Sequence, residues 1–281
     1  MFSRRRREKT KLNFMEVSII ILNYFHRDLV RELLKDIFSF NFPFSYEIIV
    51  IDNGTFDGIK ELVAHYPSIR FMQLPKNIGY AAGNNPAMKQ AKGKYILVVN
   101  PDVVLLPGAV EELHGYMENH PEVGLSGPCV MNADRSLQQS ATGFPDWHLP
   151  FYRRTFLANT KSGKAWLKKY LLEDQDHEKD FYTPALFGAC LMIRTSALFK
   201  VGLLDERYFM YMEDLDWSRR FWENNFKVAY VPQAKVIHLH KRDSANNNLW
   251  QILRKKTARA HISSFLKYLW KFKGKKLPEV K

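Results

Sequence analysis

The sequence is poor in cysteine: only Cys129 and Cys190 occur among its 281 residues, each in apolar surroundings. Two thiols supply neither a disulfide framework nor a zinc site, so a reduced, cytosolic compartment is expected. The chain has no internal repeat and no low-complexity segment, which excludes a repeat architecture. Its arginine-rich beginning lacks the apolar stretch that a secretory signal needs, and no signal peptide is expected.

Two nucleotide-binding motifs are also missing. The sequence contains no G-x-G-x-x-G and no G-x-x-x-x-G-K followed by serine or threonine. These glycine-rich loops hold the phosphates of dinucleotides in dehydrogenases and of ATP in P-loop enzymes. Both enzyme classes are therefore poorly supported.

Acidic residues are scarce at the two ends of the chain, which decides where the net charge of +13 lies. Residues 1–11 hold six basic residues and one acid, and residues 250–281 hold ten and one. The 26 basic and 27 acidic residues between them nearly cancel. A neutral body argues against a groove that follows nucleic-acid phosphates, whereas basic tails suit contact with an anionic surface.

The apolar content of 46% can fill the core of one large α/β domain. Its most informative stretch is Tyr95–Val99, a short and continuously apolar run that favours a buried strand of a parallel sheet. Asn100-Pro101-Asp102 follows directly. Ligands collect beyond the carboxyl ends of such strands, so Asp102 is a candidate ligand-binding residue. Capping of the next turn explains Asp102 equally well.

Similar strands alternate with helical patterns before this stretch. Strands are predicted at residues 17–22, 47–51 and 69–74, and helices at 28–38, 59–65 and 83–91. This alternation predicts βαβ units and a mostly parallel sheet flanked by helices. Three strands end in polar residues, at Asn23-Tyr24, Asp52-Asn53 and Asn100-Pro101-Asp102, and these ends should meet at one edge that suits a nucleotide.

Seven stretches carry a family resemblance. They are VSIIILNY, IVIDNGTFDG, NIGYAAGNN, YILVVNPDVVLLPGA, FGACLMIRTSALFKVGLLDE, YFMYMEDLDW and VPQAKVIHLH. Their order is the one expected of family 2 glycosyltransferases with the GT-A fold, and they most resemble the bacterial rhamnosyltransferase-type members. The resemblance extends from Val17 to His240. It implies transfer of a sugar, with rhamnose as the candidate, from a dTDP- or UDP-linked donor to a glycan or lipid-linked acceptor.

The resemblance also assigns roles to residues. Asp102 and His238 would hold a divalent cation, Mn²⁺ or Mg²⁺, at the donor diphosphate. The alternative for His238 is a packed histidine at a strand end, and His240 is a weaker candidate for the same cation-binding role. Asp214 would be the general base of a single displacement that inverts the anomeric carbon. Glu213, Asp216 and Gly188 would lie on the acceptor side, although acids that open a helix are often only dipole partners. The nucleotide sugar would contact these residues: Tyr24, Asp52, Asn77, Asn84 and Asn100.

The resemblance and the charge pattern together divide the chain into three parts. Residues 1–15 form a basic arm, 16–245 a GT-A domain, and 246–281 a basic amphipathic helix with Ile262, Phe265, Leu266, Leu269 and Phe272 in one stripe. This helix is too charged to span a bilayer, and it either lies on an anionic membrane or docks on the domain. We therefore expect a cytoplasmic enzyme, which is peripheral on the inner face of the plasma membrane if this helix lies on the membrane.

Two other functions remain open from the sequence. A nucleotidyltransferase would need a basic glycine-rich loop after the first strand, and Asn23-Tyr24-Phe25 is not one. A nucleic-acid binder would act through its tails, but no nucleic acid is expected as a partner of the neutral body.

Overall fold

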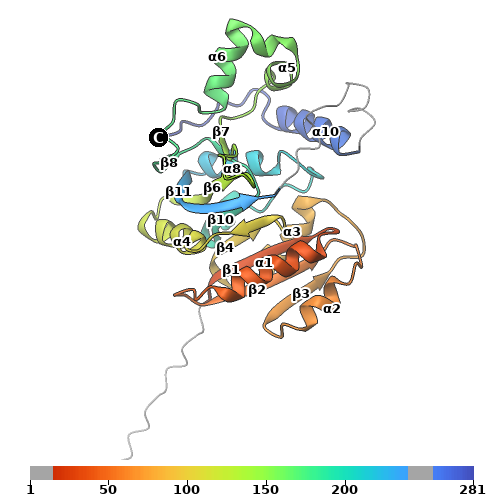
Figure 1. The fold of residues 1–281 in the computed structure, drawn as a ribbon. Helices are drawn as coiled ribbons and strands as arrows, with labels where there is room; N and C mark the ends of the chain where they lie inside the picture. Colours follow the sequence, from red (N-terminus) through yellow and green to blue (C-terminus); the bar gives the residue numbers. More distant parts are fainter. Residues whose placement is uncertain (1–14, 240–255) are drawn as a thin grey trace, which may run out of the picture.

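A computed structural model describes residues 15–239 and 256–281, and it has an α/β fold around one large sheet (Figure 1). Residues 1–14 of the basic arm, His240 and residues 246–255 of the predicted C-terminal helix lie outside the described residues. The sheet order is β3-β2-β1-β4-β10-β6-β11-β5, with β8 beside β11. Pairing is parallel among β1, β2, β3 and β4 and between β6 and β11, whereas β10 runs antiparallel to both of its neighbours.

The bounds of the elements follow the hydrophobic pattern closely. The strands are β1 (Met15–Asn23), β2 (Tyr46–Asp52), β3 (Ile69–Gln73), β4 (Gly93–Val99), β5 (Val103–Leu105), β6 (Val123–Met131), β7 (Ala141–Thr142), β8 (Phe181–Tyr182), β9 (Ala185–Leu186), β10 (Cys190–Arg194) and β11 (Lys227–His238). The helices are α1 (Arg27–Ser39), α2 (Ile59–Ala64), α3 (Tyr80–Gln90), α4 (Ala109–Asn119), α5 (Leu149–Arg154), α6 (Lys161–Tyr170), α7 (Leu198–Val201), α8 (Glu213–Glu223) and α10 (Lys256–Lys271), with 3₁₀ turns at Phe156–Asn159 and Thr195–Ala197.

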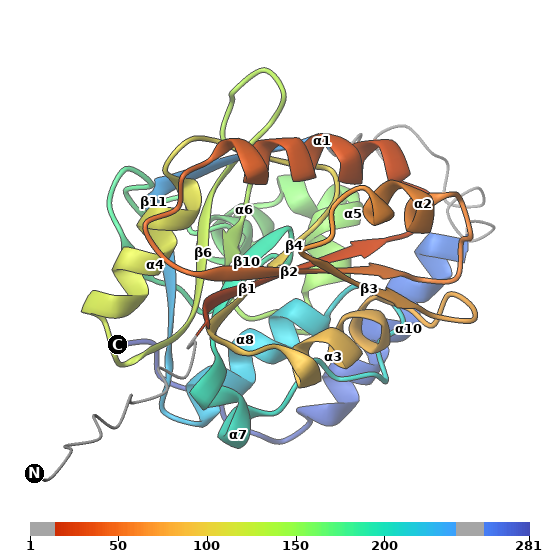
Figure 2. The ribbon, with the colours of Figure 1, turned by 90° about the horizontal axis from the view of Figure 1, so that it is seen from below.

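Both faces of the sheet are covered, which explains the continuous apolar runs of its strands. Alternate residues of β1 enter different cores: Ile19 and Ile21 pack with α1, α2 and α4, and Ile20 packs with α3, α7 and α8. Figure 2 shows α1 on one face and α3, α7 and α8 on the other. The predicted α/β class with a central sheet and flanking helices is confirmed.

One predicted helix begins earlier than its pattern indicates. The expected start was Gly83, but α3 begins at Tyr80, directly after Gly79 with a φ of +92°. A Cβ at position 79 would lie 2.3 Å from the Phe209 carbonyl oxygen, and the next N–H, that of Tyr80, donates to this oxygen at 2.8 Å. A contact between segments 130 residues apart therefore fixes the helix start.

The strand directions bring distant residues to one edge. Asn23 lies opposite Asp52, and Ile21 lies opposite Val99, so β1, β2 and β4 end together. Because β10 is antiparallel, its first residue, Cys190, also pairs with Val99. The edge therefore collects the ends of three strands and the beginning of a fourth.

The C-terminal helix α10 docks on the domain with one face. Ser264, Tyr268 and Phe272 are buried, the two aromatic rings in a cluster with Tyr208 and Met212 among others. Of the predicted apolar stripe, Phe265 and Leu269 also pack on this cluster, whereas Ile262 and Leu266 point to solvent. Within the described residues, no helix is long and apolar enough to cross a bilayer.

The docking of α10 predicts unequal effects for two aromatic residues of the same helix. Tyr268 is 1% exposed and Trp270 is 76% exposed. Tyr268→Ala should lower the free energy of unfolding by about 3–5 kcal/mol, because it leaves a cavity in the interface. Trp270→Ala should change it by less than about 0.5 kcal/mol. Denaturant unfolding of both variants checks this, and equal losses would contradict the docked position.

Candidate active site

Asp102 and His238 meet at the carboxyl edge of the sheet. Pro101 ends the ladder of β4, and β5 then pairs antiparallel with the end of β11, so that His238 lies opposite Val103. The His238 Nε2 atom is 3.3 Å from the Asp102 carboxylate, and the Leu239 N–H donates to the Asp102 carbonyl oxygen at 2.8 Å. The sequence placed these two side chains in one site, and the structure brings them together.

Gln138 contacts the other ring nitrogen of His238, and the sequence did not reveal this contact. Its amide oxygen lies 3.0 Å from His238 Nδ1 and accepts a hydrogen bond when this nitrogen is protonated. The His238 Nε2 atom faces the Asp102 carboxylate and donates to it when this nitrogen carries a proton. An imidazole nitrogen and a carboxylate oxygen are also the ligand types that a divalent ion accepts, so the pair is chemically suited to one.

The electrostatics of Asp102 agree with this arrangement. Burial alone would raise the pKa of its carboxyl group, but the hydrogen bond and charge of His238 outweigh burial and lower the pKa. Asp102 is therefore an anion at neutral pH, as a cation ligand must be.

Asp214 is the second carboxylate of the edge and lies in the first turn of α8. One of its oxygens accepts the Gly188 N–H at 2.9 Å, and the other accepts the Leu215 N–H at 2.8 Å. Burial raises the pKa of Asp214 despite these bonds, and the charge of Asp216 adds to the effect. A carboxylate that is more basic than usual and held in a fixed orientation suits proton abstraction.

Glu213 and Asp216 are not equivalent to Asp214. Glu213 is buried, one of its oxygens has no hydrogen-bond partner, and burial together with the Asp214 charge raises its pKa to about 8. Asp216 is fully buried and bonded to Arg220 at 2.7 Å and to Lys271 at 2.5 Å. The carboxylate of Asp216 thus belongs to an ion-pair network, and its expected acceptor-side role remains a prediction.

Tyr80 connects the two carboxylate centres, and sequence reasoning missed it. Its hydroxyl lies 3.0 Å from both the Asn100 side-chain oxygen and the Gly188 carbonyl oxygen. Burial raises the pKa of Tyr80 well above its ordinary value, and the charges of Glu213, Asp214 and Asp102 raise it further. One hydroxyl therefore lies in the field of both centres, which places them in a common site. The tyrosine within NIGYAAGNN was the available signal.

The predicted donor-side residues differ in accessibility. Asp52 is fully buried and accepts hydrogen bonds from Asn23, Thr55 and Gln73. Burial would raise its pKa, but the hydrogen bonds from the Thr55 and Gln73 side chains and from the backbone N–H groups of Phe56 and Thr55 lower it.

Three further residues of this set occupy different depths, and the fourth, Asn100, lies beside the Tyr80 hydroxyl. Asn77 accepts hydrogen bonds from the Asn53 amide and the Gly79 N–H. Asn84 is fully buried under the site and donates to the Tyr80 carbonyl oxygen. Tyr24 presents an exposed ring beside Phe25, with 4.9 Å between the ring centroids. Contact of these residues with a donor remains a prediction.

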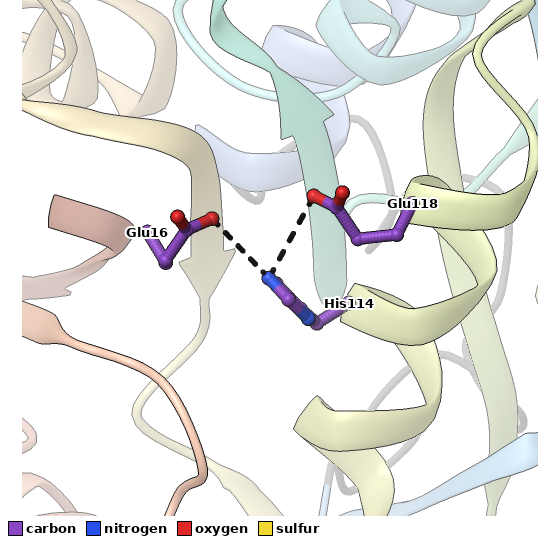
Figure 3. Close-up of side chains that lie close together, drawn as sticks. All are labelled: Glu16, His114 and Glu118. Atoms are coloured by element: carbon purple, nitrogen blue, oxygen red, sulfur yellow. Dashed lines mark ion pairs between the residues drawn. The ribbon is translucent and has the colours of Figure 1, made fainter. Parts of the chain in front are cut away.

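A second group of possible cation ligands lies elsewhere. His114 Nε2 is 3.6 Å from Glu16 and 3.9 Å from Glu118 (Figure 3). Glu16 lies near the start of β1, seven residues and about 23 Å of strand from the edge that holds Asp102. Lys94 already pairs with Glu118 at 2.5 Å. This group is therefore an ion-pair cluster that is separate from the candidate active site.

The fold is of the GT-A type, and comparisons with known proteins specify the family of the chain. The model of glycosyl transferase family 2 matches residues 18–202. The chain belongs to this family, and the resemblance seen in its motifs is confirmed.

Two curated relatives are rhamnosyltransferases by name. The N-acetylglucosaminyl-diphospho-decaprenol L-rhamnosyltransferase of Mycobacterium tuberculosis is 31% identical over 72% of this chain and 68% of its own length. The rhamnosyltransferase WbbL of Escherichia coli K12 is 26% identical over 90% of this chain and 92% of its own.

Solved structures agree in fold. GalNAc-T7 with UDP, GalNAc and Mn²⁺ has a TM-score of 0.64 at 12% identity and covers 92% of this chain, which spans only 48% of that protein. The mannosyltransferase PcManGT of Pyrobaculum calidifontis, with GDP-Man and Mn²⁺, has a TM-score of 0.58 at 18% identity and covers 94% of this chain and 66% of its own.

The raised pKa of Glu213 predicts a pH effect on stability. The unfolded chain loses this proton near its ordinary pKa, whereas the folded chain keeps it to about pH 8. The unfolded state then binds fewer protons between those values, so stability falls as pH rises through this window. Glu213→Gln should remove this part of the decline. The melting temperature of the variant minus that of the wild type should therefore increase from pH 5 to pH 8. A difference that does not change with pH would contradict the assignment.

Proposed function

We propose that this chain is an inverting, metal-dependent glycosyltransferase that moves a sugar, rhamnose by analogy with the named relatives, from a nucleotide donor. The observation that carries the proposal is the Tyr80 hydroxyl, which lies 3.0 Å from Asn100, two residues before Asp102, and 3.0 Å from the carbonyl oxygen of Gly188, whose N–H holds Asp214. One carboxylate suits a cation and the other suits a proton, and a transfer from a diphosphate to a hydroxyl needs both.

In the proposed mechanism, one centre acts on the diphosphate that leaves and the other on the hydroxyl group that attacks. Asp102 and His238 would hold Mn²⁺ or Mg²⁺, which supplies positive charge for the diphosphate that departs. Asp214 would accept the proton of the acceptor hydroxyl as that oxygen attacks the anomeric carbon. The two backbone N–H groups on Asp214 hold its carboxylate in place. A single displacement of this kind inverts the configuration at that carbon.

The residues around these centres suggest how the substrates lie. We assign the nucleotide to the edge formed by Tyr24, Asp52, Asn77 and Asn100, with Asn84 supporting it from below. The acceptor would approach from the side of Gly188, Glu213 and the helices α5 and α6, which stand above the sheet in Figure 1. The name of the mycobacterial relative supports a lipid-linked diphosphate sugar as the acceptor class.

A lipid-linked acceptor would require the enzyme to work at a membrane, and α10 has a surface for this. Beside its docked face, the helix carries a second apolar line to solvent: Ile262, Leu266 and Trp270 are 45%, 59% and 76% exposed. The basic residues Arg259 and Lys267 of this helix, and Lys273 just after it, are also exposed. Tryptophan and leucine between basic side chains suit an anionic interface, where each cation adds about 1 kcal/mol.

This membrane role belongs to α10, within residues 246–281, and leaves 16–245 as the catalytic domain. The docked and the membrane-facing alternatives for this helix are compatible, because they use different faces. We therefore propose a cytoplasmic enzyme that is peripheral on the inner face of the plasma membrane.

Nucleotide binding tests the proposed catalytic centre. Calorimetric titration with dTDP, UDP and GDP should show binding of one nucleotide with Mn²⁺ or Mg²⁺ and none with chelator. Asp102→Ala should weaken this binding at least about tenfold, because it removes a charged ligand. Asp214→Asn should keep the binding and lower turnover at least about 100-fold. Equal loss of binding in both variants would refute the separate roles.

Vesicle binding tests the proposed membrane surface. Leu266→Ser with Trp270→Ser should reduce co-sedimentation with vesicles that contain phosphatidylglycerol, because it removes the apolar line and keeps every charge. Phe199→Ser is the matched control, since Phe199 is 91% exposed but belongs to α7. Equal binding of the double variant and the wild type would refute the surface, and salt-sensitive DNA binding in place of vesicle binding would favour the nucleic-acid alternative.

A further inference from the structure

Four carboxyl groups gather where residues 205–212, which lie on the proposed acceptor side, lead into α8. Asp205 begins this segment, and Glu213, Asp214 and Asp216 lie in the first turn of the helix. Such a gathering of negative charge is unfavourable unless cations compensate it. One of the cations that compensate this charge comes from a residue far away in the sequence.

Lys271, the last residue of α10, lies between two of the four acids. Its ammonium nitrogen is 2.5 Å from Asp216 and 2.7 Å from Asp205. Asp216 is fully buried, and the side chains of Asp205 and Lys271 are mostly buried. Arg220 is the second cation on Asp216, and Arg207 is the second on Asp205. Lys271 is thus held by hydrogen-bonded ion pairs in an environment where such pairs are strong.

We propose that Lys271 is a positioning residue for Asp214: its ammonium group fixes Asp216 two residues further along α8 and balances the negative charge around the proposed base. This inference rests on the proposed function. It assigns α10 a part in the reaction site beyond packing and beyond membrane contact.

The surroundings of Asp214 explain why the balance matters there. Its own hydrogen bonds come from two backbone N–H groups, and its ionisable neighbours are Glu213, Asp216 and the hydroxyl groups of Tyr80 and Tyr170. Each of these neighbours is neutral when protonated and negative when deprotonated, so none of them supplies a positive charge. Two cations pair with Asp216 in this turn: Arg220 from α8 itself, and Lys271 from α10.

The helix α10 also holds the backbone that leads into α8. The Ser264 hydroxyl donates to the Met210 carbonyl oxygen at 2.9 Å, and Tyr268 packs in the cluster that contains Met212. Tyr211 and Met212 have φ values of 71° and 73°, in the left-handed region that costs energy for residues with a side chain. Lys271 therefore acts at the end of a helix that already maintains the geometry of this segment.

The test is the pH dependence of turnover in Lys271→Met. The loss of a positive charge should raise the pKa of the base, so the acid limb of the kcat profile should move up by about 0.5–1 pH unit. At a pH below the limb, kcat should therefore fall about three- to tenfold. Metal-dependent nucleotide binding should stay within about twofold of the wild type, because Asp102 and His238 are untouched.

Two further variants separate charge from packing. Lys271→Arg keeps the charge and should keep the limb near its wild-type pH. Asp205→Asn combined with Lys271→Met restores the net charge of the cluster, so the acid limb of its kcat profile should return at least halfway to the wild-type pH. This double variant also provides the test if Lys271→Met alone does not fold. A limb at the wild-type pH in Lys271→Met, or an equal shift in the double variant, would overturn the inference. A wild type without sugar transfer would instead refute the proposed function.

Discussion

The antiparallel placement of β10 between β4 and β6 is the constraint on which the candidate site depends. Because β10 begins where β4 ends, Gly188 and Asn100 lie at one edge although 88 positions separate them. The Tyr80 hydroxyl joins them, and the Gly188 N–H holds Asp214. A parallel strand in the same place would begin at the opposite edge, and the base would be a strand length away from the cation pair.

This arrangement gives similar side chains different chemistry. A histidine with a proton acceptor behind it keeps the pKa of Asp102 low, whereas burial among other acids raises the pKa of Asp214 and of Glu213. Carboxyl groups whose environments push their pKa values apart can serve as anion and as proton acceptor in one site. The protein achieves this with strand pairing and burial and with few charged partners.

The sequence predicted much of this because it reports local patterns. Continuous apolar runs located the buried strands, and the polar residues after them located the edge with Asp102. Family motifs added His238, which β11 does bring to that edge. Gln138, Tyr80 and Lys271 stayed hidden, because their roles arise only from contacts between distant segments. The stripe of α10 was visible, but helical periodicity could not show that Phe272 would turn inward and Leu266 outward.

The contact between Gly79 and Phe209 has a consequence for how such enzymes diversify. The helix α3 and the loop that precedes α8 meet there through main-chain atoms, the Tyr80 N–H and the Phe209 carbonyl oxygen. The side chains of Phe209 and Tyr211 remain exposed beside it. Mutation can therefore alter the surface of this loop, which we propose faces the acceptor, and leave its junction with α3 unchanged, provided that position 79 stays glycine.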